Sequence, residues 1–269
     1  MRRTPHLFRA LGLGLALSLP FAACSASQAS DDLALTVLSY NIHHGEGTDG
    51  VFDLERIAQV ILDSGADLVA LQEVDVKTGR SNGVDQASEL ARLTGMTAYF
   101  GEAIPFSGGS YGDAVLSRLP VRSHQNWKLP AAPNHEERVA VSVVVQLPNG
   151  EPVRFISTHL DHTSDPSDRI AQAKSLLRQA FPPDKKMPAT LLLGDMNAQP
   201  GSEPMRIFLE VFASAAPDGI PSFPSETPVK AIDWVLYTPV ERWQVVDIRV
   251  LDEPHASDHA PLRAVLRCD

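Results

Sequence analysis

Apolar residues recur along the chain with two spacings, and the spacing indicates which element each segment forms. A repeat of three or four positions predicts helices over residues 52–65, 85–95 and 166–181. In the first of these helices, Asp53 is the expected N-cap and Gly65 the expected stop. Alternating or continuous apolar runs rich in β-forming residues predict strands. The predicted strands are residues 33–42, 67–74, 113–121, 138–147, 152–160, 189–196, 231–237, 243–251 and 260–267.

The order of these elements mixes helix-flanked strands with hairpins. Residues 147–152, with the sequence LPNGEP, separate two adjacent predicted strands and are typical of a hairpin turn. This mixture predicts an α/β or α+β domain whose sheets are covered by helices. After residue 32 the sequence shows no internal repeat and no low-complexity segment, so we expect residues 33–269 to form one domain.

The N-terminal segment has a different character from the rest of the chain. MRRTPHLFR carries three arginines and no acidic residue, and a short apolar run that ends in small residues follows it. This pattern predicts a secretory signal over residues 1–23, followed by a flexible tether over residues 24–32. The segment that ends in Cys24 resembles a bacterial lipobox, which predicts a lipoprotein anchored in the cell envelope. Two alternatives stay open: cleavage after Ala29, giving a secreted or periplasmic protein, and a disulfide between Cys24 and Cys268.

Composition and charge narrow the range of substrates. Hydrophobic residues make up 43% of the chain and charged residues 21%, which is typical of a folded globular protein. Without residues 1–23 the chain keeps 20 of its 23 basic residues against 33 acidic ones, a net charge near −13. Duplex DNA would be repelled at long range, because affinity for nucleic acid comes largely from Lys and Arg that neutralise phosphates. The charge therefore favours a small or lipid-linked substrate over a nucleic acid polymer.

Polar side chains capable of chemistry stand at the ends of many predicted strands. Any one of them alone has a common structural explanation as a turn former, a helix cap or a solvated strand end. Their number favours a shared site, because a side chain at a strand end is held rigidly and can still face a cleft. These residues are Asn41, Glu73, His159, Asp195, Asn197, Asp233, Asp258 and His259.

The types of side chain in this set indicate an oxygen-ligated metal and a histidine base. Carboxylates and amides suit Mg²⁺, Mn²⁺ or Ca²⁺. Zinc is not favoured, because the chain has no CxxC pair and NIHH lacks the glutamate of a metalloprotease motif. A histidine facing a carboxylate has a fixed tautomer and raised basicity, as a general base requires. The absence of GxSxG and GxxxxGK[ST] motifs argues against acyl-serine and P-loop chemistry.

Seven motifs follow one another in an order that resembles the endonuclease/exonuclease/phosphatase superfamily. Pancreatic-type deoxyribonuclease, abasic-site endonuclease, neutral sphingomyelinase and inositol-polyphosphate phosphatase share its fold. The resemblance runs from about residue 33 to 267 and implies a four-layered α/β/β/α sandwich, with two mixed sheets packed face to face and a site at one sheet edge. The motifs are LSYNIHHGEG, LQEVD, YGDAVLSRLP, STHLDH, LLLGDMNAQP, IDWVLY and SDHAPL.

The resemblance also implies a metal site for one or two divalent ions, Mg²⁺ or else Mn²⁺ or Ca²⁺. Glu73 would be the principal ligand, Asn41 would lie nearby, and Asp258 would complete or flank the site. One turn would then supply both a metal ligand and, at the next residue, His259 as a proton-transfer group.

The resemblance implies catalytic roles for the remaining strand-end residues. Asp195 would orient or activate the attacking water, and Asn197 would position the water or the phosphate. His259 would be the acid/base partner, and Asp233 the carboxylate that holds its ring. His159 would hydrogen-bond a non-bridging phosphate oxygen and stabilise the negative charge of the transition state.

Other positions add to this resemblance or depart from it. Tyr111 would contact the phosphate as His159 does, and Arg80 and Arg138 would be substrate-phosphate contacts, with an ordinary surface salt bridge as the alternative for both arginines. Abasic-site enzymes carry an aspartate where this chain has His43. The family commonly has asparagine where this chain has Asp113, so a polar substrate contact is expected to be lost or changed.

Three functions are compatible with the sequence. The first is an exported metal-dependent phosphodiesterase that acts on a small molecule or a lipid headgroup by in-line attack of water. The second is an extracellular nuclease with the same machinery, which the acidic charge disfavours. The third is a catalytically inactive envelope protein that uses the fold to bind a partner. Because every expected catalytic position is filled, the sequence favours an enzyme.

Overall fold

The computed structural model describes Met1 and residues 33–268, of which residues 33–268 form two six-stranded sheets. The predicted signal and the tether at 24–32 lie outside the described residues, apart from Met1, so export and lipidation stay predictions. Among the described residues, no helix combines the length and apolar character needed to cross a bilayer.

The strand order of both sheets shows that each is mixed. Within residues 33–268, β1 runs parallel to β2 in the first sheet and β7 runs parallel to β8 in the second, and the other neighbouring strands of the two sheets are antiparallel. The first sheet runs β11 (Trp243–Val250), β12 (Leu262–Cys268), β1 (Leu33–Asn41), β2 (Leu68–Val76), β4 (Gly109–Ser117) and β3 (Thr97–Phe106). The second runs β5 (Val121–Leu129), β6 (Arg138–Gln146), β7 (Pro152–His159), β8 (Ala189–Asp195), β10 (Asp233–Thr238) and β9 (Ala213–Ser214).

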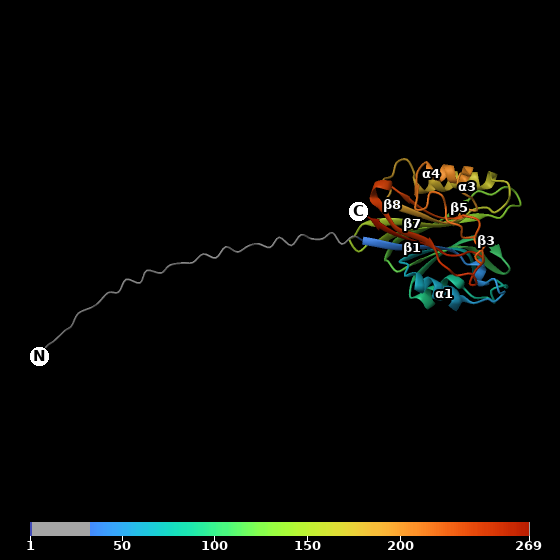
Figure 1. Ribbon diagram of the computed structural model, residues 1–269, viewed down its shortest axis with the longest axis horizontal. Helices are drawn as coiled ribbons and strands as arrows, with labels where there is room; N and C mark the ends of the chain where they lie inside the picture. Colours follow the sequence, from blue (N-terminus) through green and yellow to red (C-terminus); the bar gives the residue numbers. More distant parts are fainter. Residues whose placement is uncertain (2–32, 269) are drawn as a thin grey trace. The chain divides into compact units, whose positions relative to one another are not determined.

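Helices cover the outer face of each sheet, and Figure 1 shows the resulting four layers. The helices α1 (Leu54–Ser64) and α2 (Gln86–Thr94) pack on the first sheet. The helices α3 (Ser167–Ala180) and α4 (Glu203–Leu209) pack on the second. Short 3-10 turns are formed by His43–Gly45 and Val240–Arg242. The predicted α/β/β/α sandwich is confirmed.

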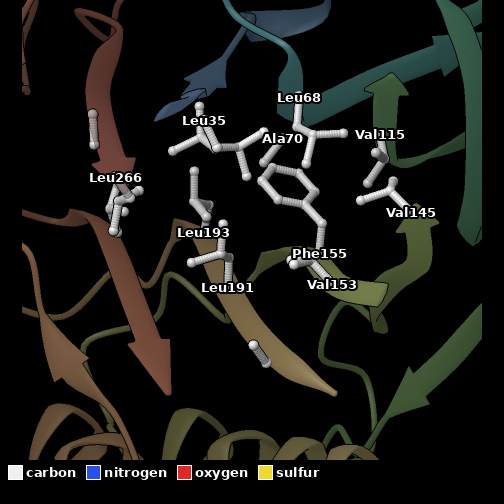
Figure 2. Close-up of a cluster of buried hydrophobic side chains, with 14 of the residues drawn as sticks. Leu35, Leu68, Ala70, Val115, Val145, Val153, Phe155, Leu191, Leu193 and Leu266 are labelled. Atoms are coloured by element: carbon white, nitrogen blue, oxygen red, sulfur yellow. The ribbon is translucent and has the colours of Figure 1, made fainter. Parts of the chain in front are cut away.

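The main core lies between the two sheets. Figure 2 shows side chains such as Leu35 and Leu68 of the first sheet facing Phe155 and Leu193 of the second. The run LLL of β8, residues 191–193, is apolar throughout because its two faces are both covered: Leu193 points into this core, whereas Leu192 packs toward α3 and α4. Strands buried on both faces make a rigid frame for residues at their ends.

The predicted helix boundaries are confirmed where the sequence carries a cap. The Asp53 side chain accepts a hydrogen bond from Arg56 N at 2.9 Å, and Gly65 adopts φ of 65° at the end of α1. Asp85 and Gly95 bound α2 in the same way.

Two segments differ from the prediction. The prediction of a single strand over 113–121 is wrong. Strand β4 ends at Ser117 and β5 begins at Val121 in the other sheet, because Pro120 interrupts the strand between them. Strand β3, helix α4 and the two-residue β9 were not predicted. In β3 the side chains are mostly part-exposed, without the alternation of a half-buried strand.

The topology brings the ends of several strands together at one edge of the sheets. In the parallel pair β7–β8, the last residues His159 and Asp195 are register partners. The antiparallel strand β10 begins at that edge, where Asp233 pairs with Asp195. Asn41, the last residue of β1, pairs with Gln72 of β2. Residues distant in sequence therefore meet on a frame of buried strands.

Candidate active site

All of the predicted site residues lie in or directly behind one cleft of about 420 Å³ at this edge. Two of them, Asn41 and Asp233, are buried and hydrogen-bond to residues of the cleft wall. The remaining predicted residues line the cleft: Glu73, Arg80, Tyr111, Arg138, His159, Asp195, Asn197, Asp258 and His259.

Glu73 reaches the cleft from an irregularity in β2. The pairing of β2 with β4 shifts register between Leu71 and Val74, and Glu73 has φ of 59°. A bulge re-aims a side chain out of the regular alternation of a strand, and positive φ at such a residue persists only where its surroundings hold it. Asn41 contributes to that support, because its Nδ2 donates to Glu73 Oε1 at 3.1 Å and to Asp195 Oδ2 at 3.3 Å. Asn41 thus links carboxylates of the two sheets.

The turn that carries Asp258 and His259 is fixed by Ser257. The buried Ser257 Oγ donates to the backbone oxygen of Asn41 at 2.7 Å and accepts from His259 N at 3.3 Å. Asp258 lines the cleft, and its backbone oxygen accepts from Ser225 N at 2.7 Å. Two neighbouring side chains of one turn therefore enter the site.

His259 lies between two buried carboxylates. Its Nδ1 is 2.9 Å from Asp233 Oδ2, and its Nε2 is 3.6 Å from Asp195 Oδ2. Burial acts to lower the pKa of His259, but Asp233 and then Asp195 outweigh burial and raise it to about 10. Asp233 Oδ2 also accepts from Ser222 Oγ at 2.5 Å. Because a carboxylate only accepts, Asp233 fixes a proton on Nδ1.

The Asp195 carboxyl is the second group of the site whose pKa is shifted from its usual value. Burial raises the pKa of Asp195 to about 7, against the opposing charge of His259. Asn197 N donates to Asp195 Oδ1 at 2.8 Å, which orients the carboxylate. Perturbed groups that face a cleft are characteristic of catalytic acids and bases.

His159 is a neutral imidazole held from both sides. Burial, and then the Arg138 guanidinium, lower the pKa of His159 well below its usual value. Arg138 Nη1 donates to His159 Nδ1 at 3.0 Å, so the imidazole proton lies on Nε2. That Nε2–H faces Asp195 Oδ2 at 3.4 Å; Asn197 Nδ2, 2.9 Å from Nε2, is itself a donor and has the backbone oxygen of Leu160 as its acceptor at 3.1 Å. His159 can therefore donate a hydrogen bond into the cleft.

Arg80 forms an ion pair and also lines the cleft, and its contact with a substrate phosphate stays a prediction. Its Nε and Nη2 donate to the two oxygens of Asp75 at 2.7 and 2.9 Å, and Asp75 is fully buried. The guanidinium lies over the rings of Phe106 and Tyr111, at 4.6 and 5.4 Å from their centroids. These contacts hold the positively charged guanidinium of Arg80 in one orientation in the cleft wall.

Comparison with known proteins identifies the family. A family model described as "Endonuclease/Exonuclease/phosphatase family" matches residues 38–259. The chain belongs to this family.

Three known proteins show how far the similarity of this chain extends. A crystal structure of an endonuclease/exonuclease/phosphatase from Beutenbergia cavernae is 26% identical with a TM-score of 0.76, covering 87% of this chain and 72% of that one. The uncharacterized protein YbhP of Escherichia coli K12 is 24% identical over 87% of this chain and 97% of its own length. A mannosyl-6-phosphatase from Bacteroides thetaiotaomicron shares the fold, with 17% identity, a TM-score of 0.69, and coverage of 86% and 99%. As a member of this family, the chain is a metal-dependent phosphoric ester hydrolase.

The site fits the divalent cation on which this family depends. Its two guanidinium groups are already paired, Arg80 with Asp75 and Arg138 with Glu136 at 3.0 Å. The carboxylates of Glu73 and the neighbouring cleft residues are therefore in excess over the cations of the wall. Carboxylate and amide oxygens are also the donors that Mg²⁺, Mn²⁺ and Ca²⁺ prefer.

Sequence reasoning missed several residues that shape this site. Asp75 holds Arg80, Ser222 holds Asp233, and the ring of Phe223 lies 4.8 Å from that of His259. His162 lines the cleft, and its Nδ1 is 3.1 Å from Arg138 Nη2. The motifs LQEVD and STHLDH contained Asp75 and His162, so their positions were the signal available. Asp113, which stands where the family commonly has asparagine, is buried. Its side chain is 3% exposed, and burial raises its pKa well above its usual value.

Proposed function

We propose that the protein is an exported phosphodiesterase that hydrolyses a small or lipid-linked phosphoester by in-line attack of water. The observation that carries the proposal is the convergence of Glu73, Asp195 and His259, with their buried partners, on one cleft. A cleft of about 420 Å³ is within the range of small-molecule sites. The acidic net charge supports a small molecule or a lipid headgroup over a nucleic acid.

The proposed mechanism assigns phosphate binding to one wall. His159, with its proton on Nε2, and Tyr111 donate to non-bridging oxygens, and Arg138 holds the His159 tautomer. Preorganised donors of this kind stabilise the charge that develops in the transition state. Arg80 places positive charge on the same cleft.

The proposed proton transfers belong to Asp195 and His259. Asp195 accepts a proton from the attacking water, since a carboxyl group with a pKa of about 7 is a competent base near neutral pH. His259, which its raised pKa of about 10 keeps protonated near neutral pH, faces that carboxylate through Nε2 and donates a proton to the leaving oxygen as the P–O bond breaks, while Asp233 holds its ring. Asn197 orients Asp195 through its backbone N–H.

Glu73, Asn41 and Asp258 would hold the metal, for which Mg²⁺ is the expected ion and Mn²⁺ or Ca²⁺ the alternatives. When bound, the cation would neutralise phosphate charge and polarise the phosphoester. Asn41 Oδ1 already accepts from His43 N at 3.1 Å, so a metal would use its second lone pair.

A substrate panel tests the proposal. Purified protein is offered bis-p-nitrophenyl phosphate, sphingomyelin, inositol phosphates and plasmid DNA with Mg²⁺, Mn²⁺ or Ca²⁺. We expect turnover of a small or lipid-linked ester that EDTA and His259→Ala abolish, while His124→Ala, at an exposed histidine on β5, retains it. Activity that survives EDTA or His259→Ala contradicts the mechanism, and faster cleavage of DNA than of the lipids would favour a nuclease.

Export and lipid attachment belong to the same proposal and rest on the sequence before residue 33. Cys24→Ala tests the anchor. The wild-type protein is expected in the membrane fraction and the variant in the soluble fraction; a soluble wild-type protein would refute the lipid anchor.

A further inference from the structure

Two histidines that take no part in the mechanism above, His43 and His44, lie beside Glu73. His43 and His44 follow β1, and ligand atoms of His43, His44 and Glu73 all lie within 4.8 Å of one another. The three residues are half-buried. Glu73 is therefore shared between the cleft and a pair of imidazoles.

The tautomer of His43 leaves one ring nitrogen free to bind a metal. His43 Nδ1 is 3.1 Å from the backbone oxygen of Glu46. A carbonyl oxygen only accepts, so Nδ1 carries the proton and Nε2 presents its lone pair. A hydrogen bond from the far nitrogen to a carbonyl is the usual way in which proteins orient a metal-binding histidine.

His44 presents the opposite nitrogen. Its Nε2 lies 3.6 Å from Glu46 Oε2, beyond hydrogen-bond distance but where the negative carboxylate favours a proton on Nε2. His44 Nδ1 is buried and has no hydrogen-bond partner among the described residues. A buried polar atom without a partner is uncommon and calls for an explanation such as an ion.

The surrounding contacts hold the two rings in place. His43 N donates to Asn41 Oδ1 at 3.1 Å, and Gln86 Nε2 donates to the backbone oxygen of His44 at 2.6 Å. The ring centroids are 4.4 Å apart and steeply inclined. The charged groups that face the imidazoles are Arg80 and the carboxylates of Glu46, Glu73 and Asp75, so negative charge exceeds positive charge around them.

We propose that His43, His44 and Glu73 form a second cation site that prefers a transition metal such as Mn²⁺, Co²⁺ or Zn²⁺ to Mg²⁺. Imidazole nitrogen is a good ligand for these ions, whereas Mg²⁺ prefers oxygen donors. Metal–ligand bonds of about 2.1 Å place three ligands of one ion about 3.4–3.6 Å from one another, so ligand atoms that lie within 4.8 Å need to move together by at most about 1.4 Å. The inference rests on the proposed function, because Glu73 is also the principal ligand of the catalytic cation.

Two conservative variants separate a metal ligand from a structural histidine. His43→Asn keeps a donor near the place of Nδ1 and removes Nε2. His44→Gln keeps a donor near the place of Nε2 and removes Nδ1. A purely structural role predicts nearly wild-type behaviour for both variants, whereas a ligand role predicts loss of the transition metal. The control is His124→Gln, at an exposed position on β5.

The experiment titrates metal-free protein with Co²⁺ and, separately, with Mg²⁺, by calorimetry and by visible absorption of bound Co²⁺. We expect the wild type and the control to bind Co²⁺ more tightly than Mg²⁺, and both variants to bind Co²⁺ at least tenfold more weakly with altered absorption bands. Affinity for Mg²⁺ is expected to change less than threefold. Equal Co²⁺ affinity in wild type and variants overturns the proposal, as does a parallel loss for both metals.

A measurement on the wild type covers the case in which a variant fails to fold. Pulsed electron paramagnetic resonance of bound Mn²⁺ detects directly coordinated nitrogen, which we expect to see. Mn²⁺ coordinated by oxygen alone overturns the second site, even if Mg²⁺-dependent hydrolysis is normal. Conversely, a protein that binds Mn²⁺ through nitrogen but hydrolyses no phosphoester retains this site and contradicts the proposed function, so the two failures are distinguishable.

Discussion

Replacing Asp233 by asparagine removes the charge that holds the catalytic histidine. Asp233 and His259 are 3% and 5% exposed, and Asp233 Oδ2 lies 2.9 Å from His259 Nδ1. The amide of asparagine has nearly the same shape as the carboxylate but can also donate, so it no longer requires a proton on Nδ1. The substitution changes charge and tautomer while leaving the packing nearly intact.

The structure sets the size of the expected effect. Opposite charges 2.9 Å apart attract by roughly 6 kcal/mol at an effective dielectric constant of about 20, which corresponds to about four pKa units. Loss of Asp233 should therefore bring the pKa of His259 from about 10 back toward its usual range. Loss of the tautomer-holding carboxylate of a catalytic histidine lowers kcat by roughly 10⁴-fold in a comparable serine-protease triad, and we expect a loss of about 10³- to 10⁴-fold here.

The pH dependence of stability gives an independent readout. A histidine whose folded-state pKa is raised stabilises the fold fully below its unfolded pKa, and this contribution is lost as the pH rises through the folded value. Asp233→Asn should therefore cost roughly 3–5 kcal/mol of unfolding free energy near pH 6, and the difference should shrink as the pH approaches 10.

The assay combines a pH–rate profile on bis-p-nitrophenyl phosphate, urea unfolding at pH 6 and pH 10, and NMR titration of His259. Ser222→Ala is the matched control, because it removes a hydrogen bond to Asp233 Oδ2 and keeps the charge. It should lower the rate less than tenfold. A rate within threefold of wild type in Asp233→Asn, together with an unchanged His259 titration, would refute the assigned role.

Three further predictions concern the metal, the cleft wall and the core. Glu73→Gln should lower both the rate and the affinity for Mg²⁺ by orders of magnitude, as EDTA lowers the rate of the wild type; a normal rate in the variant would show that another residue is the principal ligand. Arg80→Lys should raise KM about tenfold with kcat nearly unchanged, because lysine keeps the charge but cannot pair through two nitrogens with Asp75; an unchanged KM would mean that Arg80 serves the fold alone. Phe155→Ala should destabilise the protein to urea by about 3–5 kcal/mol, since the ring is fully buried between the sheets, and a loss below 1 kcal/mol would contradict that packing.

Local signals in the sequence account for the elements that were predicted correctly. Asp53 and Gly65 bound α1 through contacts within a few residues, and the apolar run of β8 follows from burial on both faces. Strand β3 has mostly part-exposed side chains and is defined by its pairing with β4, so its periodicity carries little information. The break at Pro120 separates two sheets, and the apolar pattern continues across it.

The sequence by itself determined the chemistry of the site: carboxylates, amides and histidines at strand ends, in the motif order of a phosphohydrolase family. Only the tertiary structure decided how they act on one another. Asn41 reaches Asp195 across 154 positions, and the bulge at Glu73 depends on pairing with β4. The pKa directions of Asp195 and His259 likewise come from burial and from a partner on another strand. Residue type and local spacing are properties of the chain, whereas distance, burial and charge coupling exist only after distant strands have packed.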